Sequence, residues 1–69
     1  MVNRRNRILE HRTEHSLSQA RLAFLADVHP NTVAKLERDE MAPTLPLARR
    51  IAGALGVGVD DLWPMDKAS

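Results

Sequence analysis

The stretch "LSQARLAFLADVHPNTVAKLER" (residues 17–38) decides the fold of this 69-residue chain. Ser18 is a good helix N-cap, and the residues that follow it place apolar side chains at helical spacing. Pro30 suits the first turn of another helix, because the backbone N–H that proline lacks is not needed there. We therefore expect two short helices, over about residues 18–26 and 30–38.

Only about three residues, "DVH" (27–29), join these two helices. Helices joined so tightly cannot lie antiparallel and must cross at a steep angle, as in a helix-turn-helix. Asp27 tolerates the left-handed backbone conformation better than most residues, and Val28 would fill the corner between the helices. The residues expected to face inward are Leu22, Ala23, Ala26, Val33 and Leu36, with Leu25 at the edge of the buried stripe.

Helix signals also cover the segment before this pair, and the alternating apolar pattern of strands is nearly absent from the chain. A first helix is expected from Val2 or Asn3 to Glu14, with Ile8 and Leu9 facing inward.

The segment after the pair predicts two more helices. Thr44 should cap a helix that Gly56 ends, and "GVGVDDLWP" should form a turn and a short helix ended by Pro64. The core stripe expected for the longer helix consists of Leu45, Ala48, Ile51, Ala52 and Leu55. The expected fold class is all-α: a compact five-helix domain over residues 1–64, followed by a C-terminal tail over residues 65–69.

Size and composition limit the class of protein. The length allows one small domain, and the absence of cysteine excludes disulfides and cysteine-based zinc sites. No apolar run approaches the roughly 20 residues that cross a membrane, and the N-terminus lacks the apolar part of a secretory signal. We expect a soluble, cytoplasmic protein with no membrane association and no cofactor. The pair His11 and His15 supplies too few ligands for a structural zinc site.

Residue patterns of catalysis are missing from the sequence. It has no glycine-rich phosphate loop and no Ser/His/Asp or Cys/His arrangement. As a carboxylate cluster it offers the pair Asp60–Asp61. We therefore expect no enzymatic activity.

The net charge is only +1, but the charges are unevenly distributed. Residues 1–38 hold seven Lys and Arg against four acidic residues, and residues 39–69 hold three against five. The first part therefore carries +3 and the second −2. This asymmetry fits a molecule that turns one face toward phosphate.

The helix over residues 30–38 has a polar face opposite its apolar one. If Val33 and Leu36 point inward, the side chains of Asn31, Thr32, Lys35 and Arg38 point outward. Asn can pair with two edges of adenine, Thr offers a hydroxyl and a methyl group, and Lys donates to guanine. The plain alternative is a solvated surface, but this shape and chemistry favour a helix that reads the DNA major groove.

Five elements in order carry a resemblance to a known family. They are "LSQ", "LA.LA.V", "NTV.KLER", "PTL" before the fourth helix, and "IA.ALGV..DDL" at the end of the domain. Over roughly residues 8–63 the chain resembles the Cro/C1-type (XRE) helix-turn-helix regulators. The resemblance implies a lambda-repressor-like fold and binding to double-stranded DNA.

The resemblance also implies roles for single residues. Its main base-reading segment corresponds to Pro30, Asn31 and Thr32, Lys35 matches a further base- or backbone-contacting position, and Gln19 and Arg38 match phosphate-contacting positions. Since Pro30 has no side-chain donor, we expect base contacts from Asn31, Thr32 and Lys35. We also expect backbone contacts from Ser18 and Arg5. In the family, a Gln at the position of Gln19 contacts phosphate and braces the first residues of the recognition helix. Arg12 and Glu37 match the positions of an internal ion pair between the first and third helices. In the family the "DDL" segment, which here contains Asp60 and Asp61, caps the last helix.

Several residues depart from the family pattern. Asp27 stands at the usual turn glycine, and His29 replaces the usual Ser or Thr cap. The acidic residues Asp39 and Glu40 lie in a loop that commonly approaches the DNA backbone, and they put a phosphate contact there in doubt. Phe24 is either covered by the N-terminal arm or exposed as a contact surface, and both alternatives stay open.

The resemblance implies a homodimer that reads an inverted repeat, because one recognition helix covers few base pairs. The expected dimer surface is the C-terminal end, with Leu47, Val59 and Trp63; for Trp63 we favour a core position with one exposed edge. The leading interpretation is a dimeric repressor. The alternatives are an antitoxin-type protein with a protein partner and a domain cut from a longer regulator, and Met1 with the missing linker favours a whole protein.

Overall fold

In the computed structural model, residues 6–64 are described, and they form five helices without a strand. The helices are α1 (Ile8–Glu14), α2 (Gln19–Ala26), α3 (Pro30–Glu37), α4 (Leu45–Leu55) and α5 (Val59–Leu62). This confirms the all-α, five-helix fold expected from the sequence.

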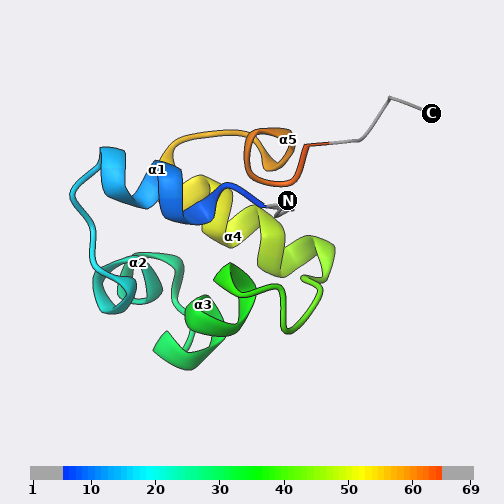
Figure 1. The fold of residues 1–69 in the computed structure, drawn as a ribbon, viewed down its shortest axis with the longest axis horizontal. Helices are drawn as coiled ribbons and strands as arrows, with labels where there is room; N and C mark the ends of the chain where they lie inside the picture. Colours follow the sequence, from blue (N-terminus) through cyan, green and yellow to red (C-terminus); the bar gives the residue numbers. More distant parts are fainter. Residues whose placement is uncertain (1–5, 65–69) are drawn as a thin grey trace, which may run out of the picture.

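The longest helix, α4, runs through the middle of the molecule (Figure 1), with α2 and α3 below it and α1 and α5 above it in this view. α4 packs against α2 and α5, α2 packs against α3, and α1 contacts α3. α4 and α1 therefore cover the inner side of the α2–α3 pair, and the other side of the pair faces solvent.

A single core of small and branched apolar side chains holds the helices together. The inward-facing residues expected of α2 and α3 are all buried, and Leu25 is exposed at the edge as expected. The prediction of a core position is wrong for two residues. Leu9 is 41% exposed because it lies beside Ile8 on the outer side of α1, and Leu45 is 55% exposed because it opens α4, where the helix reaches past the core. The core cluster is Ile8, Leu22, Ala23, Ala26, Val33, Leu36, Ile51, Ala52, Leu55 and Leu62, and Ala48 is also buried.

The first helix begins later than expected. Residues 2–5 of the expected helix lie outside the described residues, and residues 6–7 are not helical. Asn6 instead accepts a hydrogen bond from the Ile8 N–H through Oδ1 (3.1 Å), and the Arg7 N–H donates to the Leu62 carbonyl (2.8 Å). These contacts hold the chain away from helical geometry until Ile8.

Helix beginnings follow the capping residues predicted from the sequence. Ser18 Oγ accepts from the Arg21 N–H (3.0 Å), and Thr44 Oγ1 accepts from the Leu47 N–H (3.3 Å). His29, an unusual cap, accepts from the Asn31 N–H through Nδ1 (3.0 Å). Each contact satisfies a backbone donor that the helix itself leaves unpaired.

Four helices end in one type of turn, in which a left-handed residue follows the helix and the next N–H bonds to the carbonyl five residues back. Of the four left-handed residues, only Gly56 has no side chain that disfavours this conformation. The left-handed conformation expected of Asp27 is confirmed. The left-handed residues are Ser16, Asp27, Asp39 and Gly56, and the closing hydrogen bonds run from Leu17 to Arg12, Val28 to Ala23, Glu40 to Lys35 and Val57 to Ala52.

Candidate nucleic-acid interface

The turn between α2 and α3 sets the direction of α3. Asp27 is left-handed (φ 60°), and the Val28 N–H donates to the Ala23 carbonyl at 2.9 Å. Val28 is half-buried and packs against the core cluster, as expected for a residue that fills the corner. The turn is therefore fixed by its own hydrogen bonds and by an apolar contact.

The helix α3 has one face in the core and another in solvent. Val33 and Leu36 are buried on the inner face, whereas Asn31 and Lys35 are exposed. Thr32 is half-buried, so less of its side chain reaches solvent than that of its neighbour Asn31. The outer face thus presents an amide and an ammonium group about one helical turn apart.

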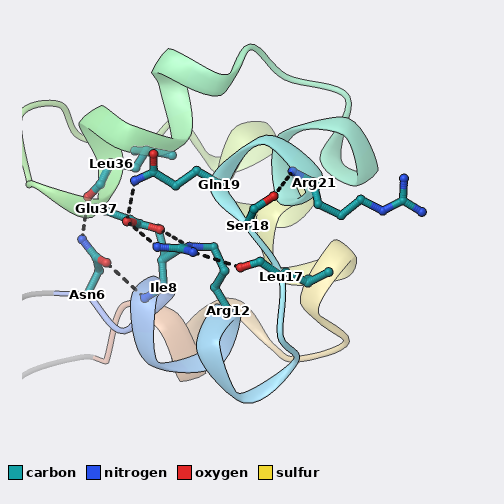
Figure 2. Close-up of polar contacts among 9 residues, drawn as sticks. All are labelled: Asn6, Ile8, Arg12, Leu17, Ser18, Gln19, Arg21, Leu36 and Glu37. Carbon is teal, nitrogen blue, oxygen red and sulfur yellow. Dashed lines mark hydrogen bonds and ion pairs between the residues drawn. The ribbon is translucent and has the colours of Figure 1, made fainter.

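A polar network around Glu37 joins the end of α3 to the other helices (Figure 2). Arg12 Nε donates to Glu37 Oε2 at 2.6 Å, and Arg12 Nη2 donates to Oε1 at 3.2 Å. The Arg12 Nη1 donates to the Leu17 carbonyl at 2.9 Å, and Gln19 Nε2 donates to Glu37 Oε1 at 2.9 Å. We call Arg12, Gln19 and Glu37 the Glu37 network; the expected Arg12–Glu37 ion pair is confirmed.

The Glu37 network is shielded from water. The side chains of Arg12 and Glu37 are 14% and 10% exposed, so solvent screens their attraction only weakly. Desolvation costs free energy, but with the additional bonds from Gln19 and to Leu17 each guanidinium nitrogen and each carboxylate oxygen has a hydrogen-bond partner. The network therefore holds α1, the start of α2 and the end of α3 in one arrangement.

Gln19 makes a different bracing contact from the one expected. It bonds to Glu37, the last residue of α3, instead of bracing the first residues of that helix. The reason is that the Glu37 carboxylate, already held by Arg12, lies within reach of the Gln19 amide. A phosphate contact by Gln19 stays a prediction.

The start of α2 presents a hydroxyl and a cation beside an aromatic ring. Ser18 is exposed, and its Oγ accepts from the Arg21 N–H, which leaves its own O–H as a donor. Arg21 extends away from the Glu37 network (Figure 2), and its guanidinium carbon lies 5.2 Å from the centre of the Phe24 ring. Phe24 is 71% exposed, and the N-terminal arm of the other alternative includes residues 1–5, which lie outside the described residues.

A second ion pair lies in solvent just after α3. Arg38 donates to Glu40 through Nε (2.7 Å) and through Nη2 (3.1 Å). The hydrogen bond from Arg38, with a smaller contribution from the charges of Arg38 and Lys35, lowers the pKa of Glu40, and the same pair raises the pKa of Arg38. The positive charge that α3 offers at this end is therefore partly offset.

Asn6 is a structural residue that sequence reasoning missed. Its side chain is buried, and its Nδ2 donates to the Leu36 carbonyl (2.7 Å) and to Asp39 Oδ1 (2.9 Å). The preference of Asn for helix starts was the available signal. Asn6 ties the segment before α1 to the end of α3. The neighbouring candidate Arg5 lies outside the described residues.

The residues predicted for a dimer surface are only partly accessible. Leu47 in α4, Val59 in α5 and Trp63 after α5 are half-buried and pack against the core cluster. Trp63 also lines a shallow depression with residues 39–43. This agrees with a core position of Trp63 with one exposed edge.

Two further properties of the described residues bear on the choice of partner. Residues 6–64 contain no group of three or more His, Cys, Asp or Glu placed to hold a metal ion. None of their helices has both the length and the apolar character needed to span a membrane.

The Asp60–Asp61 pair has the expected capping position, since Asp61 Oδ2 accepts from the Gly58 N–H at 2.9 Å.

Comparisons with known proteins agree with this geometry. A family model described as helix-turn-helix matches residues 8–62. The chain is 41% identical over 64 residues to an uncharacterized HTH-type transcriptional regulator of Methanothermobacter thermautotrophicus, covering 91% of this chain and 93% of the relative. Two uncharacterized HTH-type transcriptional regulators of Archaeoglobus fulgidus are 34% and 32% identical, over 62 and 63 residues; the matches cover 90% and 91% of this chain and 89% of each relative. The chain therefore belongs to the Cro/C1-type helix-turn-helix family of DNA-binding transcriptional regulators.

Proposed function

We propose that this regulator is a repressor that binds as a homodimer to an inverted repeat and reads it through the major groove. The observation that carries the proposal is the two-sided α3. Its inner face is fixed by Val33, Leu36 and the Glu37 network, while its outer face projects Asn31 and Lys35 into solvent. A rigid helix with exposed donors and acceptors in its first two turns fits the groove.

The proposed base readers are Asn31, Thr32 and Lys35. The Asn31 amide can both donate to and accept from one adenine, and the Lys35 ammonium can donate to guanine. Thr32, being half-buried, would contribute through whichever of its methyl and hydroxyl groups faces the groove.

The proposed backbone contacts surround these readers. The Ser18 hydroxyl and the unpaired N–H groups at the start of α2 favour a phosphate, and the second N–H of the Gln19 amide can join them. Arg38 and Arg5 would add positive charge. Such contacts fix the register of the protein on DNA and carry no sequence information by themselves.

The remaining parts of the proposal concern the whole chain. Residues 1–64 would form the DNA-binding domain and residues 65–69 a tail, with Leu47, Val59 and Trp63 at the dimer surface. The protein would act in the cytoplasm without a cofactor and without enzymatic activity.

Selection from random duplex DNA at near-physiological salt, with the mass of the protein in solution measured alongside, tests this function. Recovery of an inverted repeat with half-sites about one helical turn apart, together with a dimer mass, is the expected result. A folded protein that enriches no sequence would contradict the reading role. Enrichment of a single half-site by a monomer would contradict only the dimer.

A second candidate function is binding to a protein partner, as in an antitoxin-type module that retains DNA binding. The 71% exposure of Phe24 favours it, because aromatic side chains are enriched in protein–protein interfaces. Phe24→Ser tests it: loss of partner capture with unchanged operator affinity would support this function, and loss of operator affinity would assign the ring to DNA binding.

A further inference from the structure

Arg38 and Glu40 form an exposed ion pair at the point where α3 ends. Two hydrogen bonds, of 2.7 Å from Nε and 3.1 Å from Nη2, join the guanidinium to the carboxylate. The side chains are 58% and 49% exposed, so the pair lies in solvent, and among the proposed base readers Lys35 is close enough for its charge to act on Glu40. A carboxylate here repels the same phosphates that Arg38 is proposed to bind.

The backbone that carries Glu40 is held in an ordered turn. The Glu40 N–H donates to the Lys35 carbonyl at 2.8 Å, and the Asp39 N–H donates to the Leu36 carbonyl at 3.1 Å. Asn6 Nδ2 donates to Asp39 Oδ1 at 2.9 Å, which fastens the turn to the segment before α1. The position of Glu40 relative to α3 is therefore set by the fold.

The ion pair uses one edge of the Arg38 guanidinium. Glu40 takes hydrogen bonds from Nε and Nη2, and neither of them involves Nη1. Guanidinium groups bind phosphate most strongly through two parallel N–H donors. While Glu40 stays in place, a phosphate can bind Arg38 in this way only along the edge formed by Nη1 and Nη2, from one direction.

We propose that Glu40 is a specificity-determining residue. It orients Arg38 and leaves one edge of the guanidinium open to phosphate. Arg38 therefore increases the affinity for DNA only where the DNA backbone is held in one register relative to the protein. The inference rests on the proposed function. On the operator, base contacts fix the register, and a phosphate meets the open edge of Arg38. On random duplex no base contact fixes the register, so the charge of Glu40 offsets that of Arg38 and weakens the electrostatic attraction that supplies non-specific binding.

The test compares wild-type protein with Glu40→Gln on the selected operator and on random duplex, over a range of salt concentrations. Random-duplex affinity should rise roughly three- to sixfold near physiological salt, since Arg38 becomes available to one further phosphate. The salt slope on random duplex should steepen by about 0.9. Operator affinity should change less, so the ratio of operator to random affinity falls. Circular dichroism melting checks that the variant is folded.

Two further variants isolate the effect. Asp60→Asn removes an exposed carboxylate from α5, which lies on the other side of α4 from α3 in Figure 1, and should leave the affinity ratio near its wild-type value. In an Arg38→Ala background, Glu40→Gln should no longer alter the ratio, because the cation on which it acts is gone.

Any of three results would overturn the role of Glu40: an unchanged or higher ratio in Glu40→Gln, an equal fall in Asp60→Asn, or a persistent fall without Arg38. Each of them leaves the proposed function standing if wild-type protein still prefers its operator. A wild-type protein without any preferred sequence would overturn the proposed function, and the role of Glu40 with it.

Discussion

Two carboxylates three residues apart bind arginine in nearly the same geometry, but they differ in their exposure to solvent. Glu37 accepts from Arg12 at 2.6 and 3.2 Å, and Glu40 accepts from Arg38 at 2.7 and 3.1 Å. The first pair is shielded between helices, whereas the second is exposed. Because water screens the second pair, equal distances do not mean equal free energies. The shielded pair should act on stability, and the exposed pair on the approach of DNA.

The largest effect should come from breaking the shielded pair. Glu37→Ala leaves Arg12 and Gln19 without their acceptor in a region with little water. The free energy of unfolding should fall by about 2–4 kcal/mol, a large share of the stability of a domain this small. Urea unfolding at neutral pH measures this loss.

Glu40→Ala is the matched control for this substitution and should change the free energy of unfolding little. Arg12→Met with Glu37→Leu should recover part of the loss, since an apolar pair leaves no unpaired buried charge. Equal losses for Glu37→Ala and Glu40→Ala would show that shielding does not separate the two pairs.

The next effect concerns the outer face of α3. Asn31→Ala should weaken operator binding by about 1–3 kcal/mol and random-duplex binding far less, because a base contact carries the sequence information. Stability should stay close to wild type, since the Asn31 side chain is exposed. Titrations of both DNAs, together with a thermal melt, check this. Equal losses on the two DNAs would remove the base-reading role.

The smallest effect is the pH dependence of the exposed pair. Arg38 lowers the pKa of Glu40, so the folded state favours the ionised carboxylate. Any stability from the pair is therefore complete above the ordinary glutamate pKa of about 4.3 and is lost as the pH falls through the lower folded pKa. An NMR titration should show the pKa of Glu40 rising toward the ordinary value in Arg38→Ala. An unchanged pKa in that variant would contradict the pairing.

Much of the fold follows from local patterns in the sequence. Ser18 and Thr44 announce their helices through capping chemistry, and the i, i+3 spacing of Val33 and Leu36 identifies the buried face of α3. The resemblance supplied the Arg12–Glu37 pair, because two residues so far apart in sequence leave no periodic signal. Asp27 was identified at the turn because few residues tolerate its left-handed backbone.

The errors share a physical cause, which is that they depend on contacts between distant segments. Leu9 and Leu45 fit a helical period, but within residues 6–64 α1 and α4 meet the core through other residues, which leaves both leucines exposed. The late start of α1 depends on the Arg7 N–H, which donates to the Leu62 carbonyl, and on Asn6, whose side chain is held by the Leu36 carbonyl thirty positions along the chain. The partner of Gln19 likewise depended on where the Glu37 carboxylate comes to rest.

The two-sided construction of α3 also has a consequence for evolution. The residues proposed to read bases stand apart from those that hold the helix, so substitutions at Asn31 and Lys35 leave Val33, Leu36 and the Glu37 network untouched. After gene duplication, two copies could diverge toward different operators through a few surface substitutions. Each intermediate variant would stay folded, so a change from one DNA target to another requires no loss of stability.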